Sequence, residues 1–201
     1  NTAGTVVASS NWRRADSFIG EDLSFRPYFR EAMAGGSGRF FGIGTTRGQP
    51  GYYLASTLSD ESRTLGVAVI QVSLEQLEKS WSTVEAPAMV ADENGVVILG
   101  SVADWKFTTL RPLDEATRSA FDQTQQYNRR ALKPLGMTEI AEFEHGARLV
   151  NIARDGPEIV AVYPVIGRFL AQSRPLPGTP WTLTVLSHLE QVDEITQSRA
   201  M

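Results

Sequence analysis

The sequence predicts an α+β fold in which two similar units, each built on antiparallel strands, are joined and flanked by helices. The first observation is internal similarity, because the two halves of the 201-residue chain carry the same motifs in the same order. The second is that each half closes with an apolar, alternating strand followed at once by a helix-capping sequence. The third is the spacing of turn residues between short strand-like runs, which is typical of antiparallel sheets.

The repeat is seen when residues 1–77 are set beside residues 93–192. Each half opens with a turn and a β-rich run, at 1–7 and at 93–97. Each then has a tryptophan and an Arg-Pro pair. Each ends in a strand that leads into a helix, so the matched pairs are Trp12 with Trp105, Arg26-Pro27 with Arg111-Pro112, and Ser73 to Leu77 with Ser187 to Gln191.

The first unit is expected to begin with a turn that enters a strand over residues 1–7. Arg26 precedes a proline and is therefore biased toward extended backbone, so a short helix can begin only at about Pro27. One face of this helix carries the apolar residues, and Gly35-Gly36 end it. The apolar face consists of Phe29, Ala32 and Met33.

Residues 56–72 predict a β-hairpin whose polar turn is Ser59 to Arg63. In its second strand, Val67, Val69 and Gln71 share a face because side chains alternate across a strand. An amide at the end of this apolar face has two readings, a sheet-edge residue that meets water or a polar group of a pocket. The sequence leaves both open.

The second unit is predicted from four strand-like runs and one helix. The helix is expected over Asp114 to Arg130, where alanines and a phenylalanine are mixed with acids and amides. Residues 167–180 are expected to form a loop, because prolines and a glycine cluster there. The strands are expected at 96–101, 148–153, 159–165 and 181–186.

Two helices are expected to follow the capping sequences at Ser73 and Ser187. After the first, apolar residues with the spacing of a packed seam are expected to join the two units, and these are Leu74, Leu77, Trp81 and Val84. After the second, Leu189, Val192 and Ile195 indicate a helix that continues to the end of the chain. The predicted boundaries are therefore 1–85, 86–187 and 188–201.

Composition excludes several classes of function. The chain has no cysteine, so it has neither disulfides nor thiolate chemistry, and its net charge of −4 offers no basic stripe for nucleic acid. No window approaches the run of about 18 apolar residues that a membrane-spanning helix needs. Because the chain opens in the middle of a strand-like motif, we expect a soluble fragment of a longer protein.

No catalytic or metal-binding constellation is found, and we expect neither a metal nor a cofactor. His145 and His188 lack a neighbouring nucleophile or second ligand at metal spacing. The glycine-rich residues 35–48 fit neither nucleotide-binding motif. The acids Glu142, Glu144 and Asp155 are interpreted as a solvated edge, while an enzyme that uses them is the less favoured alternative.

The stretch from Asp22 to Tyr53 predicts a small-molecule pocket. Arg26 is expected beside the free N–H groups at the start of the helix, where a carboxylate would be favoured. Thr45, Arg47 and Tyr53 follow with further hydrogen-bond donors and few acids nearby. The alternative is that Arg26 is only a surface ion-pair partner.

Six segments resemble the extracytoplasmic sensor region of C4-dicarboxylate transport sensor histidine kinases of the DctB type. The resemblance covers most of residues 1–85 and extends weakly to the end. It implies a periplasmic pair of PAS-like modules, a double Cache domain, held between two transmembrane helices with the ligand in the membrane-distal module. The segments are Ala8 to Trp12, Ser17 to Gly20, Phe25 to Phe29, Arg39 to Thr46, Pro50 to Leu54 and Gly66 to Leu77.

The same resemblance implies that Arg26 and Thr45 hold ligand carboxylates, and Tyr28 belongs to the same motif as the arginine. Three pocket positions depart from the family pattern. Arg47 replaces a small hydroxyl residue, Gln71 replaces a lysine and Leu23 replaces an aromatic residue. Because a cation has moved across the pocket, we expect a small organic carboxylate that is either a C4-dicarboxylate or a larger or more highly charged anion, and the second of these is the first choice.

The resemblance also implies partners. These are a second copy of the chain, joined through the flanking helices, and a cognate response regulator that acts through kinase domains outside this sequence. A long helix before Asn1 is implied as well. The alternative function is a module without a pocket that serves as a dimerising spacer or as a contact for a partner protein.

Overall fold

A computed structural model describes the chain except for residues 62, 82–83, 85, 154–163 and 190–201. The chain divides into two compact units. The first contains residues 1–74 and 114–130, and the second contains residues 75–113 and 131–201, apart from those just excluded. None of the helices in the described residues combines the length and the apolar character needed to cross a bilayer.

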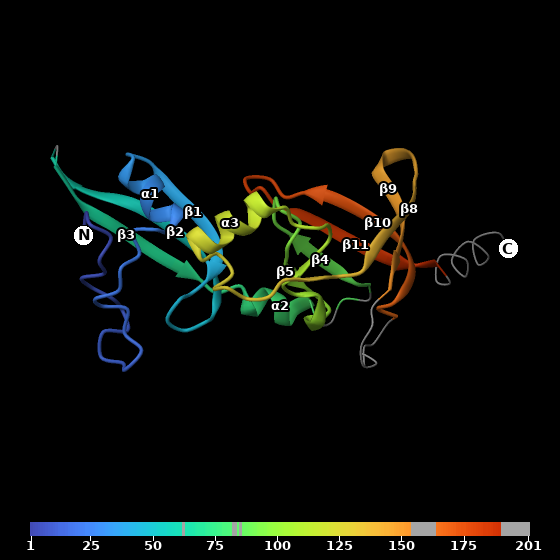
Figure 1. Cartoon of the computed structure of the whole chain (residues 1–201), viewed down its shortest axis with the longest axis horizontal. Coiled ribbons are helices and arrows are strands. Elements are labelled where there is room, and N and C mark those ends of the chain that lie inside the picture. Colours follow the sequence, from blue (N-terminus) through green and yellow to red (C-terminus); the bar gives the residue numbers. More distant parts are fainter. Residues whose placement is uncertain (62, 82–83, 85, 154–163, 190–201) are drawn as a thin grey trace. The chain divides into compact units, whose positions relative to one another are not determined.

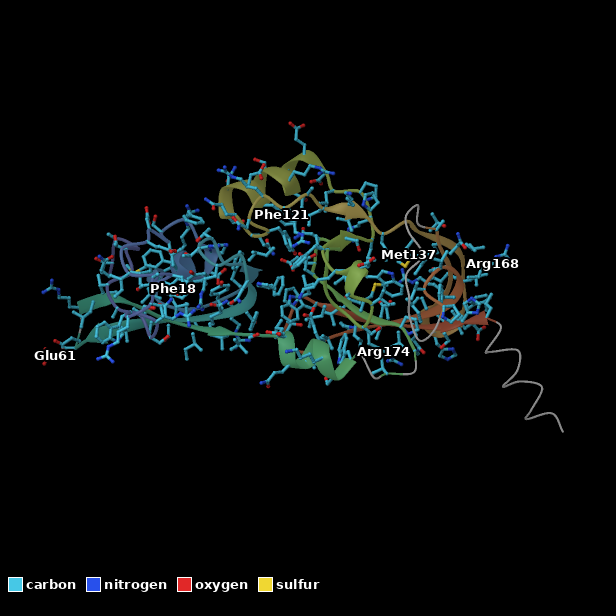
Figure 2. All side chains as sticks on the ribbon, turned by 90° about the horizontal axis from the view of Figure 1, so that it is seen from below. Phe18, Glu61, Phe121, Met137, Arg168 and Arg174 are labelled. Atoms are coloured by element: carbon cyan, nitrogen blue, oxygen red, sulfur yellow. The ribbon has the colours of Figure 1, made fainter. Side chains whose placement is uncertain are left out.

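The first unit is a three-stranded antiparallel sheet covered on one face by a short helix (Figure 1). The strands follow one another in sequence order, and Figure 2 shows Glu61 at the tip of the hairpin formed by the second and third. Aromatic residues from the helix and the sheet form the core between them. The elements are α1 (Pro27–Met33), β1 (Ser37–Ile43), β2 (Pro50–Asp60), β3 (Arg63–Val72) and α3 (Glu115–Thr124).

The predictions for α1 and for the hairpin are confirmed. Arg26 is the N-cap of α1 with extended backbone (φ −71°, ψ 134°), as expected for a residue before proline. The helix ends at Met33, before the glycine pair. β2 and β3 pair as predicted, although their connection is tighter than expected because Asp60 already pairs with Arg63.

The strand expected at residues 1–7 is wrong. Only an isolated bridge joins Thr5 to Asp22, and the segment otherwise turns irregularly. Its backbone groups bond to the later part of the same loop, since Val6 N donates to Glu21 O at 2.9 Å and Gly20 N donates to Val6 O at 2.9 Å. The segment's backbone therefore pairs with the end of the same loop and forms no strand ladder.

The helix predicted at 114–130 forms over Glu115–Thr124, and the Asp114 carboxylate caps it by accepting from Thr117 N at 2.7 Å. Sequence position suggested that this segment belongs to the second unit, but its contacts group it with the first. Ile43 N donates to Gln126 O at 2.7 Å, and Tyr127 packs 6.5 Å from the ring of Phe41.

The second unit is built on a six-stranded antiparallel sheet in the order β5-β4-β11-β10-β9-β8. Its core surrounds Trp105, Phe169 and Leu135, which are fully buried. A short parallel pair, β6 with β7, adds to it. The elements are α2 (Glu75–Trp81), β4 (Ala88–Ala91), β5 (Val97–Gly100), η1 (Ala103–Trp105), β6 (Thr108–Thr109), β7 (Lys133–Pro134), β8 (Met137–Glu142), η2 (Glu144–Gly146), β9 (Ala147–Ile152), β10 (Gly167–Pro175) and β11 (Thr182–His188).

Three of the four strands predicted in the second unit are confirmed as β5, β9 and β11. The fourth, at 159–165, lies mostly outside the described residues. The loop expected at 167–180 is wrong for its first nine residues, because Gly167–Pro175 forms β10, and is confirmed only for residues 176–180. Phe169 and Ala171 alternate into the core with no exposed surface, whereas the prolines that suggested a loop stand at and after the end of the strand.

The predicted apolar seam after Ser73 is not found in the described residues. α2 ends at Trp81, none of its side chains is buried and Leu77 is 43% exposed. Val84 lies beyond the helix, where its N–H donates to Trp81 O at 3.2 Å. The helix expected at 188–201 lies almost wholly outside the described residues, and His188 itself is the last residue of β11.

The internal repeat is visible in two turns with the same hydrogen bonds. The side-chain oxygen of Asn1 accepts from the backbone N–H groups two and four residues later, at 3.1 and 2.9 Å. That of Asp92 does the same at 3.0 and 2.8 Å. Each turn closes through a glycine in the left-handed region, Gly4 at φ 90° and Gly95 at φ 83°.

The core of the second unit yields a stability prediction. Phe169→Ala should lower the free energy of unfolding by about 3–5 kcal/mol, because it leaves a cavity at a fully buried position of a central strand. Phe143→Ala is the matched control, since Phe143 is 52% exposed and should change the free energy by less than about 1 kcal/mol. Urea unfolding measures both, and equal effects of the two substitutions would contradict the assigned core.

Candidate functional site

A cavity of about 820 Å³ lies in the first unit. It is lined by the beginning of α1, the turn after β1, parts of β2 and β3, and the loop that precedes α1. Figure 2 shows Phe18 in this loop. All seven residues that the sequence proposed for ligand binding line this one cavity, namely Leu23, Arg26, Tyr28, Thr45, Arg47, Tyr53 and Gln71.

Arg26 is a buried cation with only 2% of its surface exposed. Its Nη1 donates to Thr124 O at 3.2 Å and to Gln125 O at 3.1 Å, while Nη2 donates to Ile43 O at 2.8 Å. No carboxylate among the described residues forms an ion pair with it, and burial lowers its pKa. An arginine has five N–H donors, so these three bonds leave two for another acceptor.

The surroundings of Arg26 differ from the sequence argument, which placed the guanidinium beside the N–H groups of α1. The guanidinium is held instead by carbonyl groups, two of them at the C-terminal end of α3. Carbonyls at a helix C-terminus carry partial negative charge and therefore favour a cation. The carbonyl dipoles thus compensate part of the positive charge of Arg26, and no carboxylate among the described residues pairs with it.

Two tyrosines form the aromatic floor of the cavity. The rings of Tyr28 and Tyr53 stack with centroids 5.2 Å apart and planes 11° apart, and Phe40 packs against both. Burial raises the pKa of Tyr28 to about 12 and also raises that of Tyr53. Within the described residues no group hydrogen-bonds either phenol, so both hydroxyls remain neutral and available as donors.

Thr45 and Gln71 place further polar groups on the cavity. Thr45 is half-buried in a turn fixed by Gly48 N donating to Gly44 O at 2.9 Å, and its hydroxyl bonds to no described residue. Gln71 is exposed and lies opposite Tyr53 in the β2–β3 ladder. Its amide packs over Gly51, where a Cβ would come within 2.6 Å of Nε2, so the glycine makes room for it.

Arg47 shares its charge with a neighbouring acid. Its Nε lies 2.6 Å from Oδ2 of Asp16, and the guanidinium carbon lies 5.8 Å from the centre of the Phe18 ring. Arg14 also binds Asp16, through Nε to Oδ1 at 2.8 Å. Hydrogen bonds from Arg14 and then from Arg47 lower the pKa of Asp16 to about 2.

The charged side chains that line the cavity are two arginines and one acid. The acid is Glu21, whose carboxylate accepts a hydrogen bond from the hydroxyl of Thr46. Sequence reasoning missed Glu21, Phe18 and Asp16, because their partners stand about 30 residues away and no local pattern marks the contact. The lining is therefore suited to an anion that also has apolar surface for the β3 face.

The acidic residues considered for a metal or for catalysis give no such site in the described residues, which contain no group of three or more potential ligands. Glu142 ends β8 and Glu144 and His145 form η2, all of them exposed. Asp155 lies outside the described residues.

The chain resembles proteins whose role is known. It is 38% identical to the C4-dicarboxylate transport sensor protein DctB of Pseudomonas aeruginosa over 182 residues, which are 90% of this chain and 25% of that protein. It is 31% identical to the DctB protein of Rhizobium meliloti over 188 residues, or 94% of this chain and 29% of that one. No family model matches the chain.

A solved structure extends this likeness to the fold. The crystal structure of the sensor domain of the V. cholerae histidine kinase DctB matches with a TM-score of 0.79 and 30% identity, over 92% of this chain and 69% of that domain. A lined cavity on a Cache-type antiparallel scaffold defines the class: this is an extracytoplasmic ligand-sensing domain. The chain belongs to the DctB family of sensor domains, which are periplasmic. It spans about a quarter of the length of the two curated relatives.

The buried tyrosine yields a pH prediction. Tyr28 loses its proton near pH 10 in the unfolded chain and only near pH 12 in the folded one. Between these values the folded state binds more protons, so stability should fall as pH rises from about 10 to about 12, by about 2–3 kcal/mol. Ultraviolet absorbance of the phenolate and denaturant unfolding measure the two effects. Tyr28→Phe should remove most of the fall, and a Tyr28 phenolate that forms near pH 10 would contradict the burial.

Proposed function

We propose that the chain senses a small organic carboxylate bound in the cavity of the first unit. One carboxylate group of the ligand accepts hydrogen bonds from the two remaining N–H groups of Arg26 and from the hydroxyl of Thr45. The observation that carries this proposal is a buried guanidinium that lines the cavity without an acidic partner among the described residues. Charge-assisted bonds to a carboxylate are the strongest that such a group can make.

The chemical class of the ligand is supported by the neighbouring groups. Tyr28 and Tyr53 add neutral donors, and the β3 face supplies Val67 and Val69 for an apolar chain. The relatives from Pseudomonas aeruginosa and Rhizobium meliloti are named as C4-dicarboxylate transport sensors. Arg47 in the lining favours a ligand with a second negative group, whereas Gln71 offers only an amide.

Signalling is proposed to follow from a shift between two arrangements of the first unit. A ligand moves such an equilibrium only by binding one arrangement more tightly. In the complete protein the first unit, residues 1–74 with 114–130, would lie far from the membrane and the second unit near it, and residues 188–201 would lead to a membrane-spanning segment. The parent protein would be a homodimeric histidine kinase that acts on a response regulator.

The alternative, a module that serves only as a spacer, is less well supported because a lined cavity of about 820 Å³ is present. An enzyme that uses the acids near Glu142 has no observation in its favour.

Ligand binding can be tested by calorimetry with mono-, di- and tricarboxylates. Arg26→Ala should weaken binding by about 2–5 kcal/mol, because it removes a charged partner from a desolvated site. Arg26 also donates hydrogen bonds to three backbone carbonyls, so its removal could disturb the fold as well as the site. Thr45→Val is an independent test, because the Thr45 hydroxyl bonds to no described residue. Loss of its hydroxyl should weaken binding by about 1.5–3 kcal/mol.

Arg30→Ala is the matched control for this test. Arg30 stands one turn further along α1, is exposed and does not line the cavity. Its removal should leave affinity unchanged. Carboxylate binding that survives both Arg26→Ala and Thr45→Val in folded protein would overturn the proposal, as would the absence of binding for every carboxylate tested.

A further inference from the structure

The loop of residues 8–22, here called the strap, is fastened to the turn after β1 at two points. Asp16 binds Arg47 with 2.6 Å between Oδ2 and Nε, and the carboxylate of Glu21 accepts from the hydroxyl of Thr46. In both fastenings the strap supplies the acid and the turn supplies the donor. The cavity lining includes both donors and six strap residues, namely Ala8, Ser9, Ser10, Asn11, Phe18 and Glu21.

The strap has an internal order that presents Asp16 to the turn. Asn11 donates from Nδ2 to Asp16 O at 2.7 Å and accepts at Oδ1 from the backbone N–H of Phe18 at 3.4 Å. Arg14 approaches the same carboxylate from within the strap at 2.8 Å. Hydrogen bonds among the residues before and after Asp16 in the sequence therefore fix its position.

The charges of Arg14, Asp16 and Arg47 affect how a charged ligand can bind in the cavity. Arg14, Asp16 and Arg47 together carry a net charge of +1, because one carboxylate is shared by two guanidinium groups. Arg47 lines the cavity, whereas Asp16 lies outside the lining. A negative group of a ligand that reaches Arg47 must share that guanidinium with a carboxylate supplied by the protein.

We propose that Asp16 is a specificity-determining residue that acts through Arg47. It competes with the second carboxylate of a ligand and so weakens the binding of dicarboxylates relative to monocarboxylates of equal length. The proposal rests on the proposed carboxylate site and adds to it the residue that sets the preferred charge of the ligand. It also makes the fastening of the strap depend on ligand charge, since a dicarboxylate that takes a share of Arg47 loosens the Asp16 contact.

The test compares succinate with butyrate, a dicarboxylate and a monocarboxylate of the same chain length, by calorimetry. Asp16→Asn should raise succinate affinity about three- to tenfold at low ionic strength and leave butyrate affinity within about twofold. Added salt should reduce the gain, because the pair is partly exposed to solvent. In the Arg47→Gln background, Asp16→Asn should no longer favour succinate.

Asp22→Asn is the matched control. It makes the same change of charge at the end of the strap, but Asp22 caps the backbone N–H of Ser24 and does not line the cavity. It should alter succinate and butyrate affinity equally and by less than about twofold. Melting temperatures of all variants establish that each is folded.

The outcomes separate this proposal from the one on which it rests. If unmodified protein binds succinate and loses affinity through Thr45→Val, but Asp16→Asn leaves the succinate-to-butyrate ratio unchanged or lowers it, the role of Asp16 is overturned and the carboxylate site stands. If neither unmodified protein nor Asp16→Asn binds any carboxylate, both proposals fail.

Discussion

A buried guanidinium is the constraint on which the first unit depends. Arg26 is held by the carbonyls of Ile43, Thr124 and Gln125, which come from the end of β1 and from the end of α3. Removing a charged group from water is costly unless dipoles or charges replace the water. The three carbonyls meet part of that cost, and they also fix where β1 ends and where α3 docks. A carboxylate side chain beside Arg26 would neutralise its charge fully. It would also occupy the N–H groups that a ligand's negative group could otherwise bind.

This partial compensation explains how the surrounding residues are used. The rings of Phe25 and Phe40 lie 5.3 and 5.5 Å from the guanidinium carbon and help to keep water from it, while the neutral hydroxyls of Tyr28 and Tyr53 remain donors. Arg47, by contrast, has a side chain that is 29% exposed and a full counter-charge in Asp16. The cavity thus contains one cation compensated by dipoles and one compensated by an acid. A negative group of a ligand would interact more strongly with the first cation than with the second, because it would not have to compete with a carboxylate of the protein.

Local signals in the sequence predicted the parts of the fold that depend on local physics. The proline after Arg26 located the start of α1, alternation located β3 and β11, and the composition of residues 114–130 indicated the helix that contains α3. The strand β10 was missed because the prolines near its end outweighed the alternation of Phe169 and Ala171. For the site, the sequence identified which residues line the cavity but not what holds them. The partners of Arg26 lie 98 and 99 residues away for Thr124 and Gln125, and that of Arg47 lies 31 away at Asp16, so no spacing rule reaches them.

The membership of residues 114–130 in the first unit has a consequence for biosynthesis. The chain leaves that unit after Leu74, returns at Asp114 and leaves again after Arg130. A nascent chain that has emerged only as far as the end of α2 therefore has Arg26 and the carbonyl of Ile43, but not the carbonyls of Thr124 and Gln125. The first unit can reach its final form only after residue 130 has been made. The two units are for this reason interleaved along the chain, and the first unit cannot be completed before part of the second has been synthesised.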